Sequence, residues 1–465
     1  WIPPSSPPTQ QLFVPPIDPQ PTLVSGGQPV DDPQLSDPLP TEIAPVRSQA
    51  APLPTLASVE TELPDPGAIL LPTGTPEIYV VNTAPILYYA QAADTLRVVA
   101  IRFGVKPEQI TSSETITETG FINPGQLLII PRQLTNTTSS SQILPDSEVV
   151  YSPSAVSFDT TAFADQAGGK LKSYPEWHES TGNKLGPEIV ERVALENSIN
   201  PRLLLALLEY HSHWVYGQPE TKDQLEYPLG RVDLAKKNLY NQLVWTVNQL
   251  SIGYYAYREG RLTDIRFSDG AKIRLAPDLN AGTAALQYYF AQLYDSARWV
   301  EALDAQNGFP ALHKVMFGDP WERARTVEPL FPIGITQPSF TLPFGRNWTW
   351  SYTGGPHGAW ESDGAYAALD FAPGASESGC VETQAWAVAA ADGLVVRTGL
   401  GLVVMDLDGD GHEQTGWVLI YLHLADKGKI ALGARVAAGD PLGHPSCTGG
   451  AATGTVPATS KPSGP

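Results

Sequence analysis

The sequence predicts a multidomain α+β protein: a small βααβ module and a mostly α-helical domain, followed by a C-terminal antiparallel β-sheet domain. The chain has 465 residues, more than one compact core usually holds, so two to four domains are expected. Pro- and Ser/Thr-rich stretches without apolar periodicity divide it at residues 1–76 and 135–165. Near residue 340 the helical apolar pattern gives way to short β-branched runs between tight turns.

The charge balance narrows the classes of partner. The chain has 29 Lys and Arg against 49 Asp and Glu, a formal charge of -20. Binding to nucleic acid or to an anionic membrane surface needs basic residues, so we expect no nucleic-acid partner. No apolar run reaches the roughly 18–20 residues of a membrane span, so no transmembrane segment is expected. The first residue is Trp1 and not Met, which leaves room for a removed signal or anchor.

Residues 1–76 are predicted to be an extended spacer. Proline recurs every few residues among Ser, Thr, Gln and Asp, a composition that cannot bury enough surface to offset chain entropy. Residues 135–165, rich in Ser, Thr and Asn, are predicted to be a second linker. Such spacers typically hold a module away from a surface, which favours work at a cell wall.

Residues 77–134 are predicted to form the small module. Ile78–Val81 and Leu127–Pro131 have the composition of short strands. A helix is predicted to begin at Asp94-Thr95 and to end at Gly104, and a second helix is predicted from Pro107. The order is strand, helix, helix, strand.

This module resembles the LysM family through Ala93–Leu96, Ala100–Val105 and Pro124–Pro131, although the family usually has Gly where Ala93 stands. LysM modules bind N-acetylglucosamine polymers, including peptidoglycan. The resemblance implies a glycan groove with two walls. The alternative is that Leu96 and Pro124 only pack and the module is a spacer. The implied glycan-binding residues are Asp94, Thr95 and Leu96 on one wall, and Ile122, Asn123 and Pro124 on the other.

Residues 166–332 are predicted to be mostly helical. Pro187 and Asn200-Pro201 are helix-start signals, and the run Leu203–Leu208 is too apolar to lie anywhere but in a core. Residues 238–257 and 281–293 also carry helical apolar stripes.

The stretch 200–212 resembles the first catalytic helix of lysozyme-like lytic transglycosylases. That family ends the helix with a Glu-Ser pair, whereas this chain has His211-Ser212. Glu209 is two residues earlier, and such an offset turns a helical side chain by about 200°. We therefore expect a degenerate lysozyme-like domain that either binds glycan or has only a structural role. The alternative is that this domain cleaves glycan.

Residues 340–455 are predicted to form an antiparallel β domain. Two clusters in it suit zinc: His357, followed thirteen residues later by Asp370, and His423 in Tyr421–Leu424. Imidazole and carboxylate are good zinc ligands, but on residue types alone a core histidine is the usual alternative. Strands are predicted over 385–391, 394–398, 402–405, 417–424 and 429–432.

This domain resembles the lysostaphin-type (M23) zinc metallopeptidases, and more narrowly their beta-lytic, staphylolysin-like branch. The shared motifs are Gly-Gly-Pro-His ending at His357, Asp370, the Tyr421–Leu424 strand and the stretch Gly433–Asp440. The resemblance implies that His357 and Asp370 bind one Zn²⁺. It also implies that His423 is catalytic, stabilising the transition state or taking a proton. Peptidoglycan peptide cross-links are the family's substrates.

The third zinc ligand of that family is not found. The family has His-x-His after a Thr-Gly-Thr-like turn, but here Thr455 is followed by Val456-Pro457-Ala458 and an atypical tail, 456–465. Nothing in the spacing of His412 or His444 recommends either as a replacement. A truncated or frameshifted reading frame and a true pseudo-enzyme both remain open.

Two further features lie in the β domain. Cys380 and Cys447 are the only cysteines and are predicted to form a disulfide, typical of an oxidising compartment; two unpaired thiols are the alternative. The run Asp406–Gly411 resembles the start of a calcium loop, but Trp417 stands where the twelfth-position Glu belongs. A solvated, metal-free hairpin tip is the preferred interpretation.

Together these patterns predict an extracellular or wall-associated peptidoglycan hydrolase, a zinc metalloendopeptidase that the LysM-like module concentrates on its polymer. The alternative is a non-catalytic peptidoglycan-binding or regulatory protein with an incomplete peptidase domain.

Overall fold

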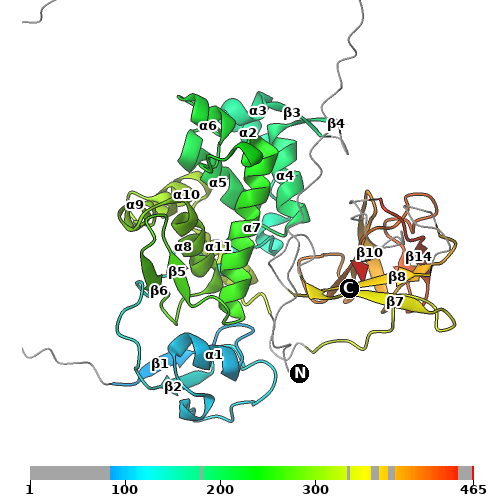
Figure 1. Cartoon of the computed structure of the whole chain (residues 1–465), viewed down its shortest axis with the longest axis horizontal. Coiled ribbons are helices and arrows are strands. Elements are labelled where there is room, and N and C mark those ends of the chain that lie inside the picture. The colour runs from blue at the N-terminus through cyan, green and yellow to red at the C-terminus, as the bar shows by residue number, and fades with distance from the viewer. Residues whose placement is uncertain are drawn as a thin grey trace, which may run out of the picture. The chain divides into compact units, whose positions relative to one another are not determined.

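The computed structural model describes residues 84–178, 182–331, 336–357, 366–374 and 383–448, with the backbone of 463–464. The described residues form a small module, a helical part and a β domain (Figure 1). The predicted spacer 1–76 and strand Ile78–Val81 lie outside these ranges. No described helix is long and apolar enough to cross a membrane.

The first module contains β1 (Ile86–Tyr89), α1 (Leu96–Phe103), the 3-10 helix η1 (Pro107–Gln109) and β2 (Leu127–Ile130). The predicted start and end of its first helix are confirmed. Thr95 Oγ1 accepts the backbone N–H of Val98, and Gly104 ends the helix at a φ of 67°. The second helix is shorter than predicted, since only one 3-10 turn forms.

The strand opposite β2 is β1, which pairs antiparallel with Ile86 facing Ile130. The sequence predicts the first strand at 78–81 and not at 86–89, although both tetrapeptides consist of aliphatic and aromatic residues. The inner face of the β1–β2 pair packs on α1, and its buried side chains include Tyr88, Val99, Phe103, Leu128 and Ile130.

The predicted linker over 135–165 is wrong for most of its length. This stretch contains the 3-10 helices η2 (Asp146–Glu148) and η3 (Pro153–Ala155) and the start of α2 (Thr160–Ala167). Distant amide side chains satisfy its backbone: Asn200 donates to the Ser147 carbonyl and Asn280 to the Leu144 carbonyl. Side chains of the segment also take part: Ser152 Oγ donates to the Ser147 carbonyl, and Thr138 Oγ1 accepts the N–H of Ala276. These bonds belong to a packed segment and not to a solvated linker.

The rest of the helical part agrees closely with its predicted helices. Asn200 caps α5 through the N–H of Arg202, and all six residues of Leu203–Leu208 are fully buried. The main helices are α4 (Gly186–Glu196), α5 (Pro201–Ser212), α7 (Leu239–Arg258), α8 (Ala281–Leu293), α10 (Phe309–Phe317) and α11 (Pro320–Val327). Shorter elements are α3 (Lys170–Ser173), β3 (Pro175–His178), β4 (Gly182–Leu185), α6 (Lys222–Glu226), η4 (Leu234–Lys236), β5 (Asp264–Arg266), β6 (Lys272–Arg274) and α9 (Ser296–Ala302).

Helices α7 and α8 form the centre of this part and are drawn in green in Figure 1. They approach closely at Gly253, where an added Cβ would lie 2.7 Å from the Cα of Ala285. Only glycine fits at that contact.

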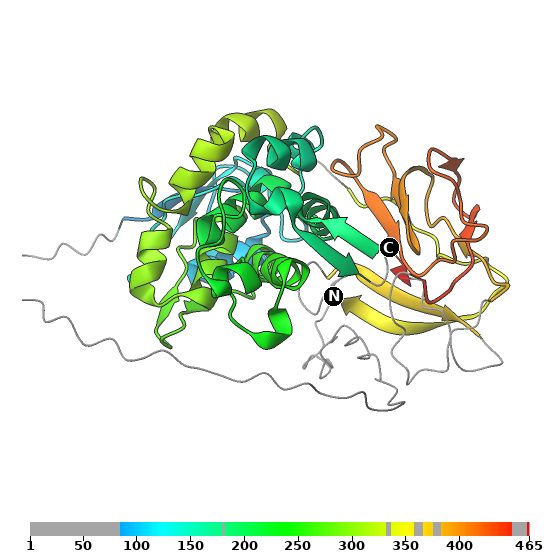
Figure 2. The same cartoon turned by 90° about the horizontal axis from the view of Figure 1, so that it is seen from above.

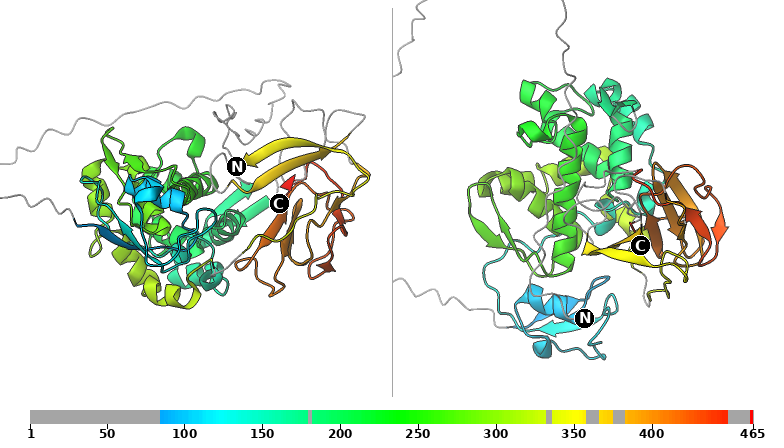
Figure 3. Two further views of the ribbon diagram at one scale, coloured as in Figure 1. Left: turned by 90° about the horizontal axis from the view of Figure 1, so that it is seen from below. Right: turned by 45° about the vertical axis from the view of Figure 1, so that its right-hand side comes forward.

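The β domain contains a four-stranded sheet in the order β12-β11-β10-β13, the pair β14-β9 and a three-stranded sheet β15-β8-β7. Figures 2 and 3 show β7 and β8 as a long yellow pair. The strands are β7 (Trp350–His357), β8 (Ala368–Pro373), β9 (Ala387–Val388), β10 (Gly393–Gly399), β11 (Leu402–Asp406), β12 (Val418–Tyr421), β13 (Arg435–Val436), β14 (Pro441–Gly443) and β15 (Ser463–Gly464).

The predicted antiparallel class is confirmed here, but individual strands differ. The strand predicted over 385–391 shortens to β9, and the one over 429–432 does not form. In the latter stretch the Ile430 N–H donates to the Leu442 carbonyl and the Ala431 carbonyl accepts the N–H of Ala434, without the repeated pairing of a strand. The core of the domain gathers Trp350, Val395, Val403, Met405, Leu419, Tyr421 and Leu442.

Candidate metal centre

The candidate site lies where β7 ends beside β8. Gly354 pairs with Asp370 and His357 with Ala368, and the register shifts on both sides of Gly354. These irregularities turn the end of β7, so that His357 Nε2 lies 3.7 Å from Asp370 Oδ1. The structure therefore brings together the two predicted zinc ligands.

The tautomer of His357 follows from its second contact. Its Nδ1 lies 2.8 Å from the carbonyl oxygen of Gly355, which can only accept a hydrogen bond. Nδ1 must therefore carry the proton, and in the neutral ring Nε2 keeps its lone pair on the side of Asp370. A backbone carbonyl in this role is typical of metal-binding histidines.

The spacing of the pair fits zinc. In a tetrahedral site with bonds near 2.1 Å, two ligand atoms are separated by about 3.4 Å, close to the 3.7 Å seen here. Both side chains keep contact with solvent, 31% exposed for His357 and 15% for Asp370, so an ion can reach them. The two residues fit zinc as part of its ligand set.

The described residues supply no third ligand to this pair. The one group of three or more acidic, His or Cys side chains found among them is Asp406, Asp408 and Asp410, on another loop. His444 donates from Nδ1 to the Ala385 carbonyl and its ring contacts Trp386. His412 is exposed within the Asp406 loop.

His423 follows β12 in a left-handed conformation, with a φ of 64°. A non-glycine residue adopts this region at a cost and often does so at functional sites. Its Nδ1 lies 3.3 Å from the Thr448 carbonyl, and its own carbonyl accepts the N–H of Ser446. The catalytic role of His423 stays a prediction.

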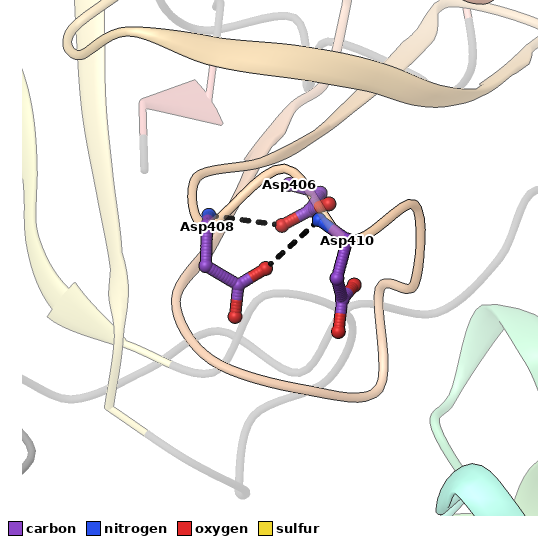
Figure 4. Close-up of side chains that lie close together, drawn as sticks. All are labelled: Asp406, Asp408 and Asp410. Carbon is purple, nitrogen blue, oxygen red and sulfur yellow. Dashed lines mark hydrogen bonds between the residues drawn. The ribbon is translucent and has the colours of Figure 1, made fainter.

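The Asp406 loop joins β11 to β12 (Figure 4). Asp406 is fully buried and accepts the backbone N–H groups of Asp408, Gly409 and Gly411, so it is not part of a solvated tip. Asp408 and Asp410 are exposed, and burial together with the Asp406 side chain raises the pKa of Asp408. The loop is held by its own hydrogen bonds, and Trp417 stands at the twelfth position.

The predicted glycan-binding residues divide into inward and outward groups. Asp94 is buried, accepting the Tyr88 hydroxyl at 2.5 Å and pairing with Arg102 at 2.7 Å. Ile122 is buried too, and its N–H donates to the Asp94 carbonyl, which links the two predicted walls. Asn123 is exposed, whereas Thr95, Leu96 and Pro124 are half-buried. Leu96 packs against the core of the module, in agreement with the packing alternative for that residue.

Glu209 has a structural role. One carboxylate oxygen accepts the backbone N–H groups of Val215 and Tyr216, and the other lies 3.3 Å from Nδ1 of His213. The side chain is 7% exposed and caps the loop after α5. Glu209 is therefore not presented to a sugar. This agrees with the sequence prediction, in which its position two residues before His211 turns it to another face of the helix.

His211, at the position of the expected general acid, is enclosed by tyrosines. Its Nε2 lies 3.0 Å from the Tyr289 hydroxyl and its Nδ1 3.1 Å from that of Tyr294. Burial, with a smaller effect of Arg298, lowers its pKa to about 3. An imidazole that is neutral near pH 7 cannot serve as the acid of glycosidic cleavage at that pH.

A buried ionic cluster escaped the sequence analysis. Glu148 is fully buried and makes two 2.8 Å bonds to Arg323, with the ring of His313 beside it. Burial lowers the pKa of His313 to about 3, followed by the charges of Arg323 and Arg202. The sequence signal was hidden because Glu148 lies in the segment interpreted as a linker.

The predicted disulfide involves Cys380, which lies outside the described residues, so its pairing with Cys447 stays a prediction. Among the described residues no cysteine is free.

Comparisons with known proteins connect part of the chain to one family. Residues 142–331 match the family model of the LasA N-terminal domain. No curated protein matches the chain. Two similar solved structures are pseudoalterin, an M23 metalloprotease from the deep sea, and an M23 peptidase candidate from Pseudomonas aeruginosa.

The first of these structures is 24% identical, with a TM-score of 0.22, and covers 28% of this chain and 69% of its own. The second is 21% identical, with a TM-score of 0.18, and covers 31% of this chain and 54% of its own. The family match begins at residue 142, inside the segment predicted to be a linker. The matched family model and these two structures are not described as a LysM module or a lytic transglycosylase.

Proposed function

We propose that this chain is a peptidoglycan-directed zinc metalloendopeptidase that cleaves peptide cross-links. The observation that carries the proposal is the His357–Asp370 pair, 3.7 Å apart, with the imidazole tautomer fixed by the Gly355 carbonyl. The match of residues 142–331 to the LasA N-terminal domain supports it. We further propose that the protein works outside the cell and that the module at 84–134 holds it on the glycan.

In this proposal each residue has a distinct task. His357 and Asp370 bind the metal, and Gly355 orients the His357 ring. Zinc, when bound, supplies a Lewis acid that polarises the peptide carbonyl and activates water. His423 moves a proton or stabilises the developing charge, and its imidazole is oriented by the Thr448 carbonyl.

A second function is favoured by one observation. The described residues hold two ligands, whereas catalytic zinc sites usually have three and a water. After Asp440 the sequence has only His444 and Cys447 as further potential ligands. With only two metal ligands the chain would be a non-catalytic peptidoglycan-binding or regulatory protein.

The test is mass spectrometry of soluble fragments from purified peptidoglycan incubated with the full chain, with and without a zinc chelator. Release of cut peptides that stops with chelator and with His357→Ala supports the peptidase. Pelleting with the wall and no fragments supports the binding protein. Anhydro-sugar release that chelator does not affect would contradict both, and would return cleavage to the helical part.

A further inference from the structure

We infer that Gly354 is a positioning residue, which fixes the Asp370 carboxylate so that a single oxygen faces the metal position. The inference rests on the proposed function, because the metal position is the one defined by His357 and Asp370. It concerns a residue that binds no metal and has no side chain.

The first step is the space beside Gly354. A Cβ added there would lie 2.9 Å from Cγ and 3.0 Å from Cβ of Asp370, and closer still to Oδ2. Real Cβ atoms essentially never come within 3.0 Å of a neighbouring heavy atom. The φ of Gly354 is not among the positive values, so the position needs glycine for its volume and not for its backbone conformation.

The second step is that Asp370 cannot simply swing aside. A terminal oxygen could rotate away from an added methyl group, but the crowding reaches Cγ and Cβ. The Asp370 Cβ is fixed by the backbone of β8, which pairs with β7 at Gly354 itself. Relief would therefore have to move one strand relative to the other, and with it Oδ1 relative to His357 Nε2.

The third step assigns the two carboxylate oxygens. Oδ1 is the atom that faces His357 Nε2 at 3.7 Å, whereas Oδ2 fits against the bare Cα of Gly354. Gly354 thus holds the carboxylate with one oxygen toward the metal position and the other on β7. A one-oxygen ligand leaves the remaining positions of a four-coordinate zinc for another ligand and a water.

The test is zinc affinity of the full chain, stripped of metal and titrated by calorimetry, for the parent, Gly354→Ala and Gly374→Ala. Gly374 is the matched control, since it follows β8 and an added Cβ there meets no described residue within 4 Å. We expect Gly354→Ala to weaken zinc binding roughly 10–100-fold, as loss of an orienting contact does, and Gly374→Ala to leave it unchanged. Equal affinities in all three proteins would overturn the inference.

A double-mutant cycle with Asp370→Ala tests the contact without metal. Gly354→Ala should lower the Tm of the metal-free parent, but should cost far less in the Asp370→Ala background, where the crowded carboxylate is gone. An unchanged cost in both backgrounds would mean that Gly354 does not position Asp370. If the parent binds no zinc but the cycle shows coupling, the metal proposal fails and the positioning stands.

Discussion

At the level of single residues, burial decides what His211 can do. Its ring is enclosed by Tyr289 and Tyr294 and is neutral when folded. An imidazole whose pKa is lowered by folding stabilises the protein fully above about pH 6.5. That stability is lost as the pH falls toward about 3, the pKa of His211 in the folded protein. In this range the unfolded chain binds a proton at His211 and the folded chain does not.

We therefore predict that His211 alone makes the helical part less stable at about pH 4.5 than at pH 7, by about 3 kcal/mol. Urea unfolding at the two pH values measures it. The neutral variant His211→Gln should show a smaller loss between them, whatever its stability at pH 7. An equal loss in both proteins would show that other groups carry the acid sensitivity.

Ala93 offers a second residue-scale prediction. Its φ of 65° lies in the left-handed region, which costs an L-residue about 1–2 kcal/mol and glycine almost nothing. Ala93→Gly should therefore stabilise the first module by about 0.5–1 kcal/mol after the extra chain entropy of glycine. Hydrogen exchange of the buried Val99 and Phe103 amides measures it. The adjacent Ala92→Gly, where φ is not positive, should destabilise.

At the metal centre, the sequence was informative through its resemblance to a family motif. Gly-Gly-Pro-His followed by Asp thirteen residues later indicated the pair His357 and Asp370, and the pairing of β7 with β8 brings these two residues together. The sequence could not show that the Asp94 side chain points inward, because a motif fixes where a residue stands and not what it contacts. The ion pair with Arg102 depends on packing across α1.

At the level of elements, helix boundaries followed from local signals. Pro187 lies in the first turn of α4, Asn200 caps α5 and Gly104 ends α1, and each of these signals needs only neighbouring residues. The segment 142–165 was missed because its order depends on distant partners. Asp146, for example, accepts from the N–H of Gly282 and the amide of Asn280. The choice between strands at 78–81 and at 86–89 likewise depended on the register with β2.

The Asp406 loop gives the prediction at this scale. Removing the Asp406 carboxylate leaves three backbone N–H groups at the end of β11 without their acceptor. Asp406→Ala should destabilise the β domain by about 3 kcal/mol. The control is Asp410→Ala, at an exposed residue whose partners can turn to water, with an expected loss below about 1 kcal/mol. Equal losses in urea unfolding would contradict the buried anchoring role of Asp406.

At the level of the whole molecule, the proposed function assigns glycan binding and peptide cleavage to different parts of the chain. The net charge of -20 gives no attraction to acidic polymers, so retention on a wall must come from specific contacts. Asn123, the exposed residue of the predicted groove, is far in sequence from His357 and Asp370. A change in one set should therefore leave the other function intact.

We accordingly predict that Asn123→Ala weakens sedimentation of the full chain with purified peptidoglycan roughly threefold to tenfold, the effect of losing one or two hydrogen bonds to a sugar. Zinc affinity should not change. Asn183→Ala, at an exposed asparagine in β4, is the matched control and should sediment like the parent. Chelator should leave sedimentation intact, since the groove needs no metal. If Asn123→Ala pellets as well as the parent, the outward residues do not bind glycan, and the module is a spacer. If chelator releases the parent from the wall, retention depends on the metal centre, and the two tasks are not separate.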